Sequence, residues 1–150
     1  MISMILVPVD GSRHADVAID WASDLAVRYE AGLVLLHVIA TWRPDVYAEE
    51  ARALQRIEHN DTTEYDLLQL IGRRIVEPAE KRARSRGVSM PRTTIEVGDP
   101  AEIVLEQART LKADLIVMGR RGLGTLPGLL LGSVSSKVIH LSDCACLTVK

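Results

Sequence analysis

One pattern constrains the fold of this 150-residue chain more than any other feature. Short apolar runs alternate with segments whose apolar residues recur at the spacing of one helix face. Successive apolar positions, as in residues 4–9, are typical of parallel strands that are covered on both faces. We predict five strands, at residues 4–9, 33–39, 93–97, 114–118 and 145–149. Helical segments between the strands indicate the α/β class, as a single doubly wound domain over residues 1–150 with a parallel sheet and helices on both faces.

The first helix follows Ser12, a suitable N-cap, and its apolar stripe continues until Gly32, which we expect to be the C′ stop. A later helix begins at Asp99-Pro100, with Asp99 as N-cap and Glu102 as the acid of a capping box. Residues 133–141 form the last predicted helix.

A longer helix is expected over residues 62–86, kinked or divided by Pro78. Residues 93–97 alternate in polarity, which indicates an edge strand with one wetter face. Pro8 cannot donate a hydrogen bond to a sheet ladder, so we place it at the carboxyl end of its strand, where neighbouring strands diverge.

The composition excludes several classes of protein. The net charge is −2 and the pI is about 6.1, so no extended nucleic-acid or membrane surface is expected. Cys144 and Cys146 are predicted to share one face of a strand as free thiols, because neighbours at this spacing are poorly placed for a disulfide. We see neither a signal peptide nor a membrane span, and we expect a cytoplasmic protein.

A glycine-rich connection follows the apolar run at 114–118. Its spacing is G-x2-G-x9-G-S, formed by Gly119, Gly122, Gly132 and Ser133. A glycine loop between a strand and a helix N-terminus lets backbone N–H groups approach a phosphate. The spacing matches neither a Walker A loop, which needs Lys before Ser133, nor a G-x-G-x-x-G dinucleotide loop. An ordinary strand-to-helix connection is the alternative interpretation.

The chain resembles the universal stress protein family in this spacing and in further segments along its length. These are Ile5 to Ser12, Leu36-His37-Val38, Gly98-Asp99-Pro100, Asp114 to Gly119 and Cys144 to Val149. The resemblance implies a dimeric, ATP-binding α/β domain with strand order 3-2-1-4-5, in which Mg²⁺ is held through the phosphates and waters. It implies no defined catalytic reaction.

The candidate binding residues surround the carboxyl ends of the first, second and fourth strands. They are Pro8, Val9, Asp10, Val38, Met118, Gly119, Arg121, Gly122, Gly132, Ser133, Val134 and Ser135. Asp10 ends the first strand at the switch point, where an acid can bind ribose hydroxyls or the waters of a bound cation. The alternative for Asp10 is a turn residue that binds its own backbone. The adenine role of Val38 rests on the resemblance.

Other polar residues have competing interpretations. Arg121 is preferred to Arg120 as the phosphate-binding cation. The hydroxyls of Ser133 and Ser135 would bind phosphates beside the first-turn amides, or simply cap the helix. The four histidines show no metal-site spacing, and His37 is expected in the core. We identify no catalytic set of residues.

Three functions are left open by the sequence. A nucleotide-responsive regulator, read by a protein partner, is favoured over a slow ATPase or phosphoryl transferase, because the loop lacks a Walker Lys and a recognisable base. The third is a dimeric interaction module that binds no nucleotide. The strand at 145–149 would be an open edge in a monomer, so we expect a homodimer through this strand.

Overall fold

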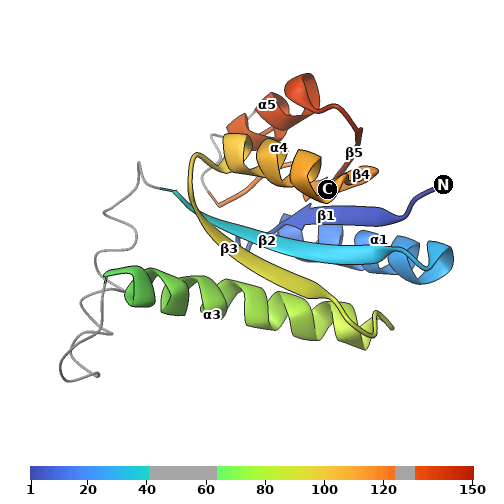
Figure 1. Ribbon diagram of the computed structural model, residues 1–150, viewed down its shortest axis with the longest axis horizontal. Coiled ribbons are helices and arrows are strands. Elements are labelled where there is room, and N and C mark those ends of the chain that lie inside the picture. The colour runs from blue at the N-terminus through green and yellow to red at the C-terminus, as the bar shows by residue number, and fades with distance from the viewer. Residues whose placement is uncertain (41–63, 124–130) are drawn as a thin grey trace.

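The computed structural model describes residues 1–40, 64–123 and 131–150, and within them five strands and four helices (Figure 1). The strands are β1 (Met4–Pro8), β2 (Gly32–Ala40), β3 (Arg92–Gly98), β4 (Leu115–Gly119) and β5 (Ala145–Val149). The helices are α1 (Arg13–Tyr29), α3 (Glu64–Ser85), α4 (Pro100–Leu111) and α5 (Ser133–Leu141). All neighbouring strands are parallel, in the order β3-β2-β1-β4-β5, which confirms the predicted α/β fold and strand order.

Helices cover both faces of the sheet (Figure 1). α1 and α3 pack on one face, where their buried residues form a cluster with Ile5, Val7 and Leu35. α4 and α5 pack on the opposite face, which presents Leu6 and Leu36. Because successive strand residues point to opposite faces, the apolar runs supply both clusters at once.

Helix α1 begins as predicted and ends earlier. The hydroxyl of Ser12 accepts the N–H of Ala15 at 3.2 Å, so Ser12 is the N-cap. The prediction that Gly32 stops this helix is wrong. Glu30 takes the left-handed conformation at φ 54° and ends the helix, and the N–H of Gly32 donates to the carbonyl of Ser3 at 2.8 Å at the start of β2.

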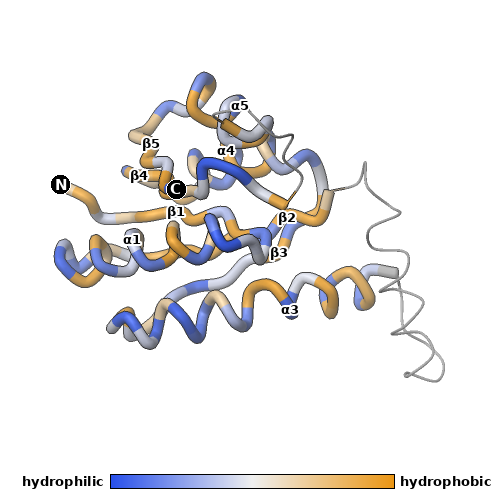
Figure 2. Tube along the Cα trace, turned by 180° about the vertical axis from the view of Figure 1, so that it is seen from behind, coloured by the Kyte–Doolittle hydropathy of each residue, from blue (hydrophilic) through white to orange (hydrophobic). Residues whose placement is uncertain are grey.

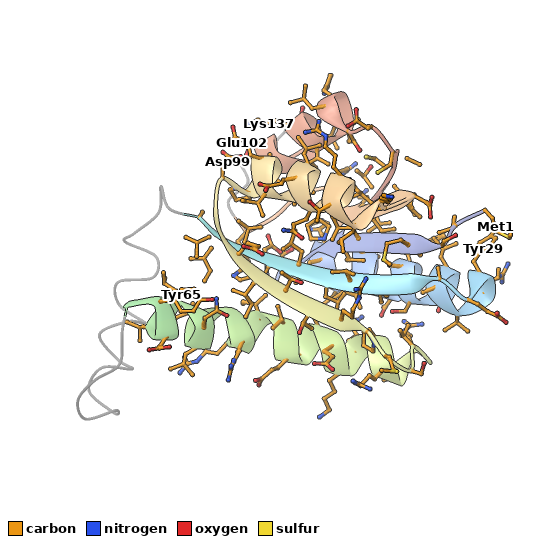
Figure 3. All side chains as sticks on the ribbon, viewed as in Figure 1. Met1, Tyr29, Tyr65, Asp99, Glu102 and Lys137 are labelled. Atoms are coloured by element: carbon orange, nitrogen blue, oxygen red, sulfur yellow. The ribbon has the colours of Figure 1, made fainter. Side chains whose placement is uncertain are left out.

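Helix α4 has half of the predicted capping box. The Asp99 carboxylate accepts the N–H of Glu102 at 3.0 Å, and this bond lowers the pKa of Asp99. The carboxylate of Glu102 does not return to the N-cap, because it pairs with Lys137 of α5 at 3.1 Å. Figure 3 shows these three side chains together where α4 and α5 meet. The polar contact therefore joins two helices.

Helix α3 runs through Pro78 as one helix of 22 residues, so the expected division is wrong. Both Pro78 and Arg74, whose carbonyl the proline leaves without its helical donor, are exposed, and water can satisfy that carbonyl. Hydrophobic and hydrophilic residues alternate turn by turn along this helix (Figure 2). Residues 62–63 of the predicted helix lie outside the described ranges. β3 is an edge strand, as predicted.

Candidate functional site

A cavity of about 270 Å³ lies at the carboxyl ends of β1, β2 and β4. This is the switch point of the sheet, where α/β proteins bind ligands. β1 pairs with β4 only at Ile5 and Leu6, and β1 ends at Pro8, so the two strands separate at the predicted place. Every candidate binding residue from the sequence lines this cavity.

The three glycines of the G-x2-G-x9-G-S spacing have different surroundings. A Cβ atom on Gly119 would lie 2.7 Å from Cβ of His14, and one on Gly122 would lie 2.5 Å from Oδ2 of Asp10. A Cβ atom on Gly132 would have no heavy atom closer than 3.6 Å. The first two glycines are therefore explained by contacts within the protein, whereas Gly132 leaves free space beside the cavity.

The Asp10 carboxylate joins two parts of the site. Its Oδ1 atom accepts the N–H of Ser12 at 3.0 Å, which is the predicted turn contact. Its Oδ2 atom accepts the N–H of Leu123 at 3.1 Å, which holds the glycine loop against the end of β1. A carboxylate has about four acceptor positions, so these two bonds leave acceptor capacity for a ligand.

The N-terminus of α5 borders the cavity without a side-chain cap. Gly132 occupies the N-cap position, and its N–H donates to the carbonyl of Arg120 at 2.9 Å. The hydroxyl of Ser135 also donates to this carbonyl, at 2.9 Å, so its proton is held within the protein. The first-turn amides of Ser133 and Val134, together with the exposed hydroxyl of Ser133, are the donors suited to an anion.

The two loop arginines have separate places. Arg121 lines the cavity. The backbone of Arg120 is used inside the protein, because its N–H donates to the carbonyl of Val149 at 2.7 Å and its carbonyl accepts from Gly132. Arg121 therefore lies along the cavity, and its role as the phosphate-binding cation stays a prediction.

The wall of the cavity that β2 and α4 form is apolar. Val38 and Ala40 of β2 face this space together with Pro100 and Val104 of α4. The sequence reasoning omitted the two α4 residues, although the Gly98-Asp99-Pro100 segment was a signal for this element. A flat aromatic base suits such a wall, because the wall contributes contact area without polar groups to desolvate.

His37 is a core histidine, as predicted, with 5 % of its surface exposed. Its Nδ1 atom lies 2.8 Å from the carbonyl oxygen of Val9. Since a carbonyl can only accept, Nδ1 carries the proton. Burial lowers the pKa of His37, which keeps the ring neutral.

Cys144 and Cys146 are free thiols, and both pack against the α4 and α5 side of the core. Among residues 1–40, 64–123 and 131–150, no group of three or more His, Cys, Asp or Glu side chains is placed to hold a metal ion. No helix within those ranges is long and apolar enough to cross a membrane.

A doubly wound parallel sheet with a cavity at its switch point defines the class of open α/β proteins that bind ligands at the carboxyl ends of their strands. The model of the universal stress protein family matches residues 1–150, and the chain belongs to this family. Universal stress protein YxiE of Bacillus subtilis is 34% identical over 162 residues, covering 100% of both chains.

Solved structures agree with this assignment. Hypothetical protein MJ0577 superposes with a TM-score of 0.77 at 28% identity, covering 100% of this chain and 96% of the other. A universal stress protein in complex with cAMP superposes with a TM-score of 0.73 at 26% identity, covering 99% and 97%.

Proposed function

We propose that this protein binds ATP in the switch-point cavity and acts as a nucleotide-responsive regulator. The observation that carries the proposal is the uncapped N-terminus of α5 at Gly132, which borders the cavity. First-turn N–H groups and the helix dipole favour an anion at such a position. The related protein solved with cAMP supports an adenine nucleotide as the ligand.

The remaining parts of the cavity suit the rest of the nucleotide. The apolar wall of Val38, Pro100 and Val104 would contact the base. Asp10 would accept hydrogen bonds from the ribose, and Arg121 would pair with phosphate oxygens. Mg²⁺ would be held by the phosphates and by waters, since Mg²⁺ commonly keeps several waters and few protein ligands.

A regulatory role fits the chemistry of the cavity better than rapid catalysis. Phosphoryl transfer needs a positioned nucleophile and usually a residue that orients it. Among the described residues that line the cavity, Asp10 is the acidic one, and its two oxygens already accept from the N–H groups of Ser12 and Leu123. We therefore expect turnover far below the range of about 1–100 per second that is usual for kinases.

We also propose that the protein is a homodimer that pairs through β5. This strand is at one edge of the sheet, beside β4, and it extends to Val149. Unpaired strand edges favour pairing with another chain, and a two-fold axis would place two copies of β5 side by side. Sedimentation showing a monomer at micromolar concentration, with and without ATP, would refute this arrangement.

One experiment separates the candidate functions. Protein is incubated with ATP and Mg²⁺, bound nucleotide is identified by mass analysis after denaturation, and phosphate release is followed for hours. Intact bound ATP supports the regulator. Rapid release that Asp10→Ala abolishes would indicate an ATPase, and the absence of any bound nucleotide would indicate an interaction module.

A further inference from the structure

The ladder between β1 and β2 ends in an unusual way at His37. The N–H of Val9 donates to the carbonyl of Leu36 at 2.8 Å, which continues the parallel ladder one step beyond Pro8. In a parallel ladder the reciprocal bond would run from the N–H of Val38 to the carbonyl of Val9. No backbone bond joins these two groups, although both residues are described.

The His37 side chain takes the place of that missing donor. Its Nδ1 atom donates to the Val9 carbonyl at 2.8 Å, and the ring is buried. The N–H of Val38 therefore remains available on the β1 side of β2, where Val38 lines the cavity. A buried amide without a partner is costly unless a ligand or water satisfies it.

We infer that His37 is a positioning residue for the base of the bound nucleotide, which rests on the proposed function of the cavity. By capping the carbonyl of Val9, His37 keeps β1 and β2 apart at their carboxyl ends and leaves the Val38 backbone free. An adenine ring offers acceptor nitrogens to that N–H. His37 is also among the residues that line the cavity, but the role inferred here is the hydrogen bond from its Nδ1 atom to the Val9 carbonyl.

Two variants separate positioning from mere packing. His37→Leu fills a similar space and removes the donor, whereas His37→Asn keeps an N–H donor near the position of Nδ1. Without the donor, the Val9 carbonyl can accept the Val38 N–H, and the strands close. We expect His37→Leu to lower the affinities for ATP and for adenosine by the same factor of about three to ten, which corresponds to the free energy of one hydrogen bond. His37→Asn should restore both affinities.

Amide hydrogen exchange tests the strand end directly in the ligand-free protein. In the unmodified chain the Val38 amide should exchange much faster than that of Leu36, which lies in the paired part of β2. Exchange at Val38 should slow in His37→Leu, and in the unmodified chain when ATP is added. This last measurement needs no variant, so it decides the inference even if His37→Leu does not fold.

Several results would overturn the inference. They are slow exchange at Val38 before ATP is added, unchanged exchange after it is added, and full ATP affinity in folded His37→Leu. Equal weakening by the Leu and Asn variants would also contradict it, because loss of packing would then explain the effect. If the unmodified chain does not bind ATP, the proposed function is refuted. The role of His37 in positioning the base is then refuted too, whatever the exchange rate of the Val38 amide in the ligand-free protein.

Discussion

Adding one methyl group at Gly132 should remove nucleotide binding and leave the fold intact. Gly132 has φ −73° and ψ 164°, which any residue can adopt, and its nearest potential neighbours, Cα of Arg121 and Oγ of Ser135, are at 3.6 Å. Alanine is a slightly poorer N-cap than glycine, and it reduces the entropy of the unfolded chain. We expect the free energy of unfolding of Gly132→Ala to change by less than about 1 kcal/mol.

Gly119→Ala is the matched control, because its methyl group meets the protein instead of the cavity. The added Cβ would lie 2.7 Å from Cβ and 2.9 Å from the carbonyl carbon of His14 in α1. Such overpacking should lower the free energy of unfolding by about 1–3 kcal/mol. At about 2–4 °C per kcal/mol for a chain of this size, Tm should fall by roughly 2–12 °C.

Thermal unfolding with and without ATP measures both effects. ATP at about a hundred times the Kd of the unmodified protein stabilises a binding-competent chain by about 2.7 kcal/mol. We expect this rise in Tm for the unmodified chain and none for Gly132→Ala, whereas Gly119→Ala should already have a lower Tm without ATP. The reasoning is refuted if Gly132→Ala keeps the full rise, or if its ligand-free Tm falls as far as that of Gly119→Ala.

Three further variants test the contacts of the fold and the site. The ion pair with Arg82 lowers the pKa of Asp20, so the stability that this pair gives the unmodified chain should be lost as pH falls below about 3.9. Asp20→Asn removes the pair, and unfolding followed against pH should show no such loss in this variant. Asp99→Ala should cost about 1 kcal/mol through loss of the α4 N-cap, measured by denaturant unfolding. Gly122→Ala should displace the Asp10 carboxylate and weaken ATP binding, measured by calorimetry.

The strands were predictable because burial on both faces leaves a simple pattern. Every predicted strand end lies within one residue of the observed end. The errors occurred where tertiary context outweighed a local signal. Glu30 took the left-handed position that glycine usually fills, and Pro78 was accommodated on the exposed side of α3. Sequence alone does not reveal which face of a helix meets water at a given turn.

The candidate site was predictable to the extent that it depends on strand ends. Residues such as Val9 and Met118 line the cavity because parallel strands bring their carboxyl ends to one edge. Contributions from a covering helix, such as Val104, depend on how α4 lies across the sheet. The hydroxyl of Ser135 donates to the Arg120 carbonyl, so its proton is not available to a ligand. Residue spacing does not predict whether such a hydroxyl binds a protein acceptor or a ligand.

The loop ends around the cavity are already fixed before a ligand arrives. Asp10 holds the N–H of Leu123, and the Arg120 carbonyl holds Gly132 and Ser135. A ribose hydroxyl need not displace Leu123, because a carboxylate oxygen accepts more than one hydrogen bond. Since binding affinity is reduced by the ordering that binding requires, these internal hydrogen bonds favour binding of the proposed nucleotide. The first-turn amides of α5, which we propose as donors to a phosphate, therefore follow a loop end that internal hydrogen bonds hold in place.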